Sequence, residues 1–148
     1  AVIDILDRYD PAVGVLAGFM RVLTPNFVNH FGGRILNIHP ALLPLFKGLD
    51  THQRALDAGV RLHGCTVHFV SAELDGGSII GQAAVPVLAS DTAETLAARV
   101  LRLEHIHYPR AVYAVASGRV RIDNGRTVTD DETAKYLAIF DKDNASAA

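Results

Sequence analysis

The apolar positions along the chain follow two kinds of pattern. Short, nearly continuous apolar runs predict strands, the first two of them fully buried, at Val13–Ala17, Ile35–Ile38, Thr66–Val70 and Ile79–Val87. Apolar residues at helical spacing predict helices at Ala1–Tyr9, Pro25–Phe31, Thr51–Ala58 and Thr92–His107. Pro109 either interrupts the last helix or starts another. Because strands alternate with helices, we expect an α/β protein whose site lies at strand ends.

The C-terminal part of the chain carries weaker signals. Val120–Ile122 and Thr127–Thr129 flank Asn124–Gly125, which predicts a β-hairpin. The following residues, 130–148, are polar and rich in alanine, which predicts a weakly ordered tail. We therefore expect one folded domain over residues 1–129, followed by this tail.

Composition then narrows the classes of function. The chain has 148 residues and a formal net charge of −2, which argues against a dedicated binder of nucleic acid or of an anionic membrane. Its apolar runs are far shorter than the roughly 20 residues of a membrane-spanning helix. The single cysteine, Cys65, excludes an internal disulfide framework and a multi-cysteine zinc site. A lone cysteine fits a reducing compartment, so we expect a cytoplasmic protein.

The segment Asn37-Ile38-His39-Pro40 carries the strongest chemical signal. Residues two apart in a strand face the same side, so Asn37 and His39 can project together. An amide can donate a hydrogen bond to a developing oxyanion, and a histidine can supply a proton near neutral pH. On spacing alone, an alternative interpretation has equal support, namely that the two residues are a polar strand end that caps a neighbouring turn.

Asp75 follows the third predicted strand in Glu73-Leu74-Asp75-Gly76-Gly77. The two glycines permit a tight turn, so this carboxylate could be directed back toward His39. A carboxylate beside a histidine favours the imidazolium and fixes its orientation. An ordinary Asx-turn is the alternative interpretation, and it is favoured for Asp75 taken alone.

The remaining candidate residues give weaker signals. His63 and His68 lie at the third strand, and His105 and His107 lie on the long helix. Neither pair has a third ligand at a familiar metal spacing, so we expect no metal. Cys65 is interpreted as a small core residue rather than a nucleophile.

Four segments together resemble the phosphoribosylglycinamide formyltransferases, the folate-dependent enzymes also called glycinamide ribonucleotide transformylases. They are Leu16-Ala17-Gly18-Phe19-Met20-Arg21-Val22-Leu23, Ile35-Leu36-Asn37-Ile38-His39-Pro40-Ala41-Leu42-Leu43-Pro44, His63-Gly64-Cys65-Thr66-Val67-His68-Phe69-Val70 and Glu73-Leu74-Asp75-Gly76-Gly77. The resemblance runs from about Ala1 to about Thr129. It implies a Rossmann-like formyltransferase fold, with a mostly parallel sheet flanked by helices.

The resemblance also implies an activity, namely direct transfer of a formyl group from 10-formyltetrahydrofolate to the amine of glycinamide ribonucleotide in purine biosynthesis. Asn37 would stabilise the tetrahedral oxyanion, His39 would be the general acid, and Asp75 would hold and charge His39. The folate cosubstrate would contact Met20, Arg21, Val22, Leu23, Asn37, Ser71, Ala72, Glu73, Leu74 and Asp75. The ribonucleotide would contact Pro40 and Glu104, and the reaction needs no metal.

The chain departs from the family pattern in two ways. Many relatives have a histidine where this chain has Asp50, so the family role of that position does not carry over. The first third of the usual chain, with its N-terminal strands, phosphate-binding glycine loop and a folate-contacting arginine, is also missing. We therefore interpret residues 1–129 as the C-terminal two-thirds of a formyltransferase domain, with little transfer expected from this chain alone. An uncovered sheet edge would allow copies to pair into a homo-oligomer.

Two other functions remain open at this point. A 10-formyltetrahydrofolate hydrolase of the same superfamily uses similar residues to deliver the formyl group to water. The other is a non-catalytic, folate-binding remnant of such an enzyme.

Overall fold

The computed structural model describes residues 1–19 and 21–143; Met20 and residues 144–148 lie outside the described residues. Within them, five strands form one sheet in the order β1-β2-β3-β4-β7. These strands are β1 (Gly14–Leu16), β2 (Ile35–His39), β3 (Leu62–Phe69), β4 (Ile79–Pro86) and β7 (Ala138–Phe140). β3 pairs antiparallel with both neighbours, whereas β1 with β2 and β4 with β7 pair in parallel. Four strands therefore point one way and β3 points the other, which confirms a mostly parallel sheet.

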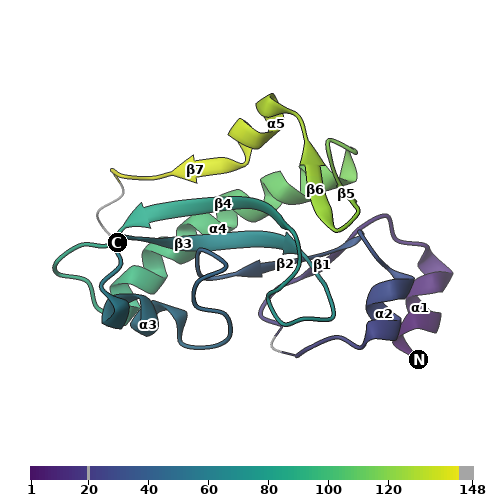
Figure 1. The fold of residues 1–148 in the computed structure, drawn as a ribbon, viewed down its shortest axis with the longest axis horizontal. Coiled ribbons are helices and arrows are strands. Elements are labelled where there is room, and N and C mark those ends of the chain that lie inside the picture. Colours follow the sequence, from purple (N-terminus) through teal and green to yellow (C-terminus); the bar gives the residue numbers. More distant parts are fainter. Residues whose placement is uncertain (20, 144–148) are drawn as a thin grey trace.

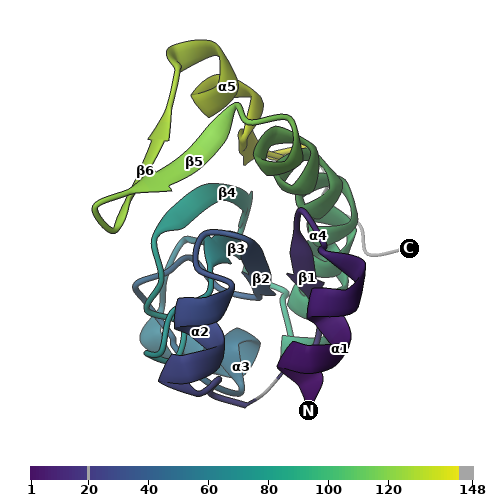
Figure 2. The same cartoon turned by 90° about the vertical axis from the view of Figure 1, so that its right-hand side faces the viewer.

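Helices surround this sheet (Figures 1 and 2). They are α1 (Val2–Tyr9), α2 (Pro25–His30), α3 (Thr51–Ala58), α4 (Ala93–Ala116) and α5 (Asp131–Tyr136). The longest, α4, packs across β3 and β4. Its buried residues, including Leu96, Val100 and Leu103, meet Cys65 and Val85 of the sheet in a hydrophobic core. The structure therefore confirms Cys65 as a core residue, fully buried, and burial raises the pKa of its thiol to about 12.

The structure corrects the predicted first strand and the interpretation of Pro109. The strand predicted at Val13–Ala17 is a short edge strand, and Val15 is 47% exposed rather than buried on both faces. The long helix continues through Pro109 to Ala116. Buried residues on both sides of the proline, such as His107 and Ala111, hold α4 against the sheet, and this packing outweighs the lost backbone hydrogen bond.

The C-terminal part is more ordered than its composition predicts. The hairpin is present as β5 (Val120–Asp123) and β6 (Arg126–Thr129), which pair antiparallel. Residues 131–140 of the predicted weakly ordered tail form α5 and β7 instead, and β7 adds a strand beside β4. The Asp130 side chain accepts a hydrogen bond from the Thr133 amide and so caps α5. Pairing with β4 is a long-range contact, which composition does not report.

Candidate active site

Strand β2 places the two central candidates. Asn37 and His39 lie two residues apart near the end of β2, where the register pairs Asn37 with His68 and His39 with Thr66 of β3. Asn37 is half-buried, whereas His39 is only 5% exposed. The register therefore brings side chains of two neighbouring strands to one small area of the sheet.

Asp75 reaches His39 from the loop between β3 and β4. Its Oδ2 atom lies 3.5 Å from His39 Nδ1 and accepts a hydrogen bond of 2.9 Å from the Gly48 amide. The Asp75 backbone has a φ of 50°, in the left-handed region. At Gly77 a Cβ atom would lie 1.6 Å from the Phe69 carbonyl oxygen, so the loop requires a glycine there. The loop geometry thus confirms that the Asp75 carboxylate is directed at His39.

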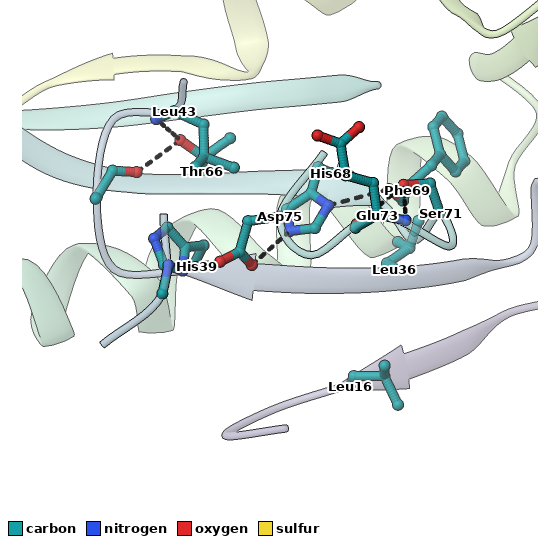
Figure 3. A network of polar contacts seen from close by, with 12 residues as sticks. Leu16, Leu36, His39, Leu43, Thr66, His68, Phe69, Ser71, Glu73 and Asp75 are labelled. Atoms are coloured by element: carbon teal, nitrogen blue, oxygen red, sulfur yellow. Dashed lines mark hydrogen bonds and ion pairs between the residues drawn. The ribbon is translucent and has the colours of Figure 1, made fainter. Parts of the chain in front are cut away.

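The segment after β2 covers the other side of His39. His39 Nε2 lies 2.8 Å from the Phe46 carbonyl oxygen, and because a carbonyl only accepts, Nε2 carries a hydrogen in this arrangement. The segment itself is anchored by the buried Thr66 hydroxyl, which donates to the Ala41 carbonyl and accepts from the Leu43 amide (Figure 3). Sequence reasoning missed these contacts because they involve backbone atoms or a single threonine.

A second histidine lies beside Asp75. His68 Nε2 is 3.9 Å from Asp75 Oδ1, and His68 Nδ1 is 3.0 Å from the Phe69 carbonyl oxygen (Figure 3). His68 is 2% exposed. Burial lowers the pKa of His68, although the hydrogen bond to Phe69 and the Asp75 carboxylate act in the opposite direction. Asp75 therefore lies between two histidines rather than one.

Most residues that the family resemblance assigns to folate line one pocket. Its walls come from the segment after β1, from β2 and from the loop after β3. They include Arg21, Val22, Leu23, Asn37, Ser71, Glu73, Leu74 and Asp75, together with Leu16, Phe19, His68 and Val70. Ala72 is exposed and is not part of the lining. Met20 lies outside the described residues, so the structure does not place it.

The two residues expected to contact the ribonucleotide lie outside this pocket's lining. Pro40 follows His39 directly, and its carbonyl accepts a hydrogen bond from the Thr51 hydroxyl. Glu104 is half-buried on α4, and burial raises the pKa of its carboxyl to about 7. Glu104 and Pro40, like His39, therefore lie outside the lining of the pocket that contains Asn37 and Asp75.

A pair of histidines lies behind the segment that covers His39. His52 Nδ1 and His63 Nε2 are 3.1 Å apart, and the His63 ring lies edge-on to Phe46. Burial and the proximity of His52 and His39 lower the pKa of His63 to about 4. Over residues 1–19 and 21–143, no group of three or more histidine, cysteine, aspartate or glutamate side chains is arranged to hold a metal ion. Over the same ranges, the helices are too short or too polar to cross a membrane.

Comparison with known proteins gives one consistent result. Residues 1–112 match the model of the formyl transferase family. The phosphoribosylglycinamide formyltransferase of Escherichia coli strain K12 is 50% identical over 127 residues, and the match covers 86% of this chain and 60% of that protein. The trifunctional purine biosynthetic protein adenosine-3 of Bos taurus is 51% identical over 134 residues, which cover 88% of this chain and 13% of that protein.

Solved structures agree with the sequence matches. The phosphoribosylglycinamide formyltransferase of Anaplasma phagocytophilum superposes with a TM-score of 0.86 at 44% identity, covering 95% of this chain and 69% of that one. A formyltetrahydrofolate deformylase of Pseudomonas syringae superposes with a TM-score of 0.81 at 32% identity, covering 88% and 44%. The chain spans about 60% of the length of the Escherichia coli relative. These likenesses confirm the predicted Rossmann-like formyltransferase fold, and the chain belongs to the formyl transferase family.

Proposed function

We propose that this chain carries the catalytic residues of an enzyme that transfers a formyl group from 10-formyltetrahydrofolate to the amine of glycinamide ribonucleotide. The observation that carries the proposal is that Asp75 lies 3.5 Å from His39 and lines one pocket together with Asn37. The identity of about 50% to two purine biosynthetic proteins supports this substrate pair. We further propose that this chain forms the C-terminal two-thirds of the formyltransferase domain, with α5 and β7 as part of that domain, and that the protein is cytoplasmic.

The proposed reaction forms one C–N bond and breaks another. The amine nitrogen attacks the formyl carbon, the carbonyl oxygen becomes an oxyanion, and the bond to N10 of the folate then breaks. The amine loses one proton and N10 gains one, so no oxidant, reductant or metal is needed. The Asn37 amide is the neutral donor for the oxyanion, and such donors act most strongly when they are held in place beforehand.

His39 is the proposed proton donor in this sequence. Its Nε2–H group must exchange the Phe46 carbonyl for the substrate atom that receives the proton, while Nδ1 remains beside Asp75. The Asp75 carboxylate, 3.5 Å from Nδ1, restricts the rotation of the ring. In the proposed binding mode, the folate occupies the pocket lined by Val22, Leu74 and their neighbours. The ribonucleotide approaches from the side of Pro40 and Glu104.

A formyl-labelled cosubstrate tests this function directly. The purified full-length protein that contains this chain is incubated with 10-formyltetrahydrofolate that carries a labelled formyl group, with and without glycinamide ribonucleotide. We expect label in the ribonucleotide fraction only when the amine is present, and loss of this transfer in Asn37→Ala. The deformylase likeness makes hydrolysis the second candidate, and labelled formate released at the same rate without the amine would favour it. Binding of the folate without either product would instead identify a non-catalytic remnant.

A further inference from the structure

The protonation of His68 follows from its contacts. Its Nδ1 atom lies 3.0 Å from the Phe69 carbonyl oxygen, which can only accept, so Nδ1 carries the hydrogen. Since burial lowers the pKa of His68, the ring is neutral near pH 7. In a neutral imidazole with its hydrogen on Nδ1, the Nε2 atom is an acceptor.

That Nε2 acceptor is buried and faces a second acceptor. It has no hydrogen-bond partner among the described residues, and Asp75 Oδ1 lies 3.9 Å away. Both residues belong to the lining of the pocket that also contains Asn37. Leaving a buried polar atom without a partner costs free energy, so the pair requires a donor between the two atoms.

The separation of the two atoms limits what this donor can be. A group with two hydrogens reaches two acceptors roughly 4 Å apart when each hydrogen bond is about 2.8 Å long. A water molecule and a primary amine share this chemistry. Both would fix Asp75 Oδ1 from the side opposite to His39 and Gly48, which contact Oδ2.

We propose that His68 is a positioning residue that holds the Asp75 carboxylate beside His39. His68 Nε2 and Asp75 Oδ1 each accept one hydrogen from the same donor, a group with two hydrogens. The donor is either a bound water molecule or the attacking amine of the substrate. The cross-strand pairing of His68 with Asn37 supports the assignment, because it fixes the ring on the same area of the sheet as the other candidates. For its kinetic part, the inference rests on the proposed formyl transfer.

Two variants separate positioning from a merely structural role. His68→Asn keeps a donor near the position of Nδ1 for the Phe69 carbonyl, but it removes the group that faces Asp75. His68→Gln places its amide near the position of Nε2 and so keeps a polar group facing Asp75. If His68 positions Asp75, the Asn variant is impaired and the Gln variant is not. If His68 acts only through its hydrogen bond to the Phe69 carbonyl, the Gln variant is impaired and the Asn variant is not.

The first measurement does not depend on activity. In the wild-type chain, long-range proton–nitrogen NMR at pH 7.5 should show a neutral His68 with its hydrogen on Nδ1. A hydrogen on Nε2 instead, or on both nitrogens, would overturn the proposal. If the shared donor is water, the carboxyl carbon signal of Asp75 in the free protein should move in His68→Asn and stay in place in His68→Gln.

The second measurement is the rate of formyl transfer. We expect His68→Asn to lose about 10- to 100-fold in kcat if the donor is water, the size typical of one hydrogen bond to a charged group. If the donor is the amine, the loss appears as a higher KM for the ribonucleotide, with an unchanged Asp75 signal in the free protein. An Asn variant equal to the wild type in every measurement, or a Gln variant equally impaired, would refute the positioning role.

Failure of the proposed function remains distinguishable from failure of this inference. If the full-length wild-type protein that contains this chain transfers no formyl group to any amine, the proposed function is wrong and the NMR measurements alone decide the role of His68. In that case, an Asp75 signal that moves in His68→Asn and not in His68→Gln supports positioning through water. A signal that stays in place in both variants contradicts it.

Discussion

Acid should destabilise this protein through His63, and the structure gives the size of the effect. His63 is 1% exposed, and its pKa falls from 6.5 to about 4 because it is buried and lies close to His52 and His39. Above pH 6.5 the ring is neutral in both the folded and the unfolded chain. Between pH 6.5 and about 4 the unfolded chain binds a proton that the folded chain does not, so the free energy of unfolding decreases as the pH is lowered through this range.

The magnitude follows from the shift. One unit of pKa difference corresponds to about 1.4 kcal/mol, so the fully developed loss is about 3 kcal/mol, of which about 2 kcal/mol is already lost at pH 5. The test is His63→Gln, which has no titrating ring and keeps an amide that can bond to His52 Nδ1. The same window contains other buried histidines, so only the difference between wild type and variant isolates His63.

Urea denaturation at pH 7.5 and at pH 5 measures the effect. We expect the free energy of unfolding of the wild type to fall by about 2 kcal/mol more than that of His63→Gln between these two pH values. Activity is not needed for this measurement. If both proteins lose the same free energy, then His63 does not stay neutral in the folded chain, and the reasoning from its burial is wrong.

Three further predictions concern the site and its support. Asn37→Ala should lower kcat for formyl transfer about 100- to 1,000-fold with an unchanged urea midpoint, because one oxyanion donor is lost. Asp91→Asn should lower the free energy of unfolding by about 3 kcal/mol in urea titrations, because Arg99, 1% exposed, keeps its charge without a buried counterion. Gly77→Ala should abolish transfer in the same assay, because its Cβ atom would collide with the Phe69 carbonyl and displace the loop that carries Asp75.

Much of the fold could be predicted because its signals are local. The order of the first four strands and helices follows from runs of apolar residues, and Asn124–Gly125 marks the hairpin that the structure contains. The strand β7 could not be predicted in this way, because three residues carry no periodicity and its stability comes from pairing with β4. For the same reason, the exposed edge position of β1 is decided by which strands pair, not by its own apolar run.

The same distinction between local and long-range signals applies to the candidate site. The two-residue spacing of Asn37 and His39 in a strand placed them together from sequence alone. The Phe46 carbonyl and the Gly48 amide are also part of the site, but backbone groups have no residue identity that a sequence could signal. The sequence indicates His68 only as a weak candidate metal ligand, because its closeness to Asp75 depends on the register between β2 and β3.

The direction of β3 explains why Asp75 needs so unusual a loop. The carboxyl ends of parallel strands meet at one edge of a sheet, so loops that follow them converge without further help. β3 is antiparallel to β2, and its last residue, Phe69, pairs with Leu36 near the start of β2, away from His39. The loop must therefore fold back over the sheet to reach His39. The left-handed backbone of Asp75 and the close approach of Gly77 to the Phe69 carbonyl make that return, so the carboxylate depends on the loop geometry as much as on its own identity.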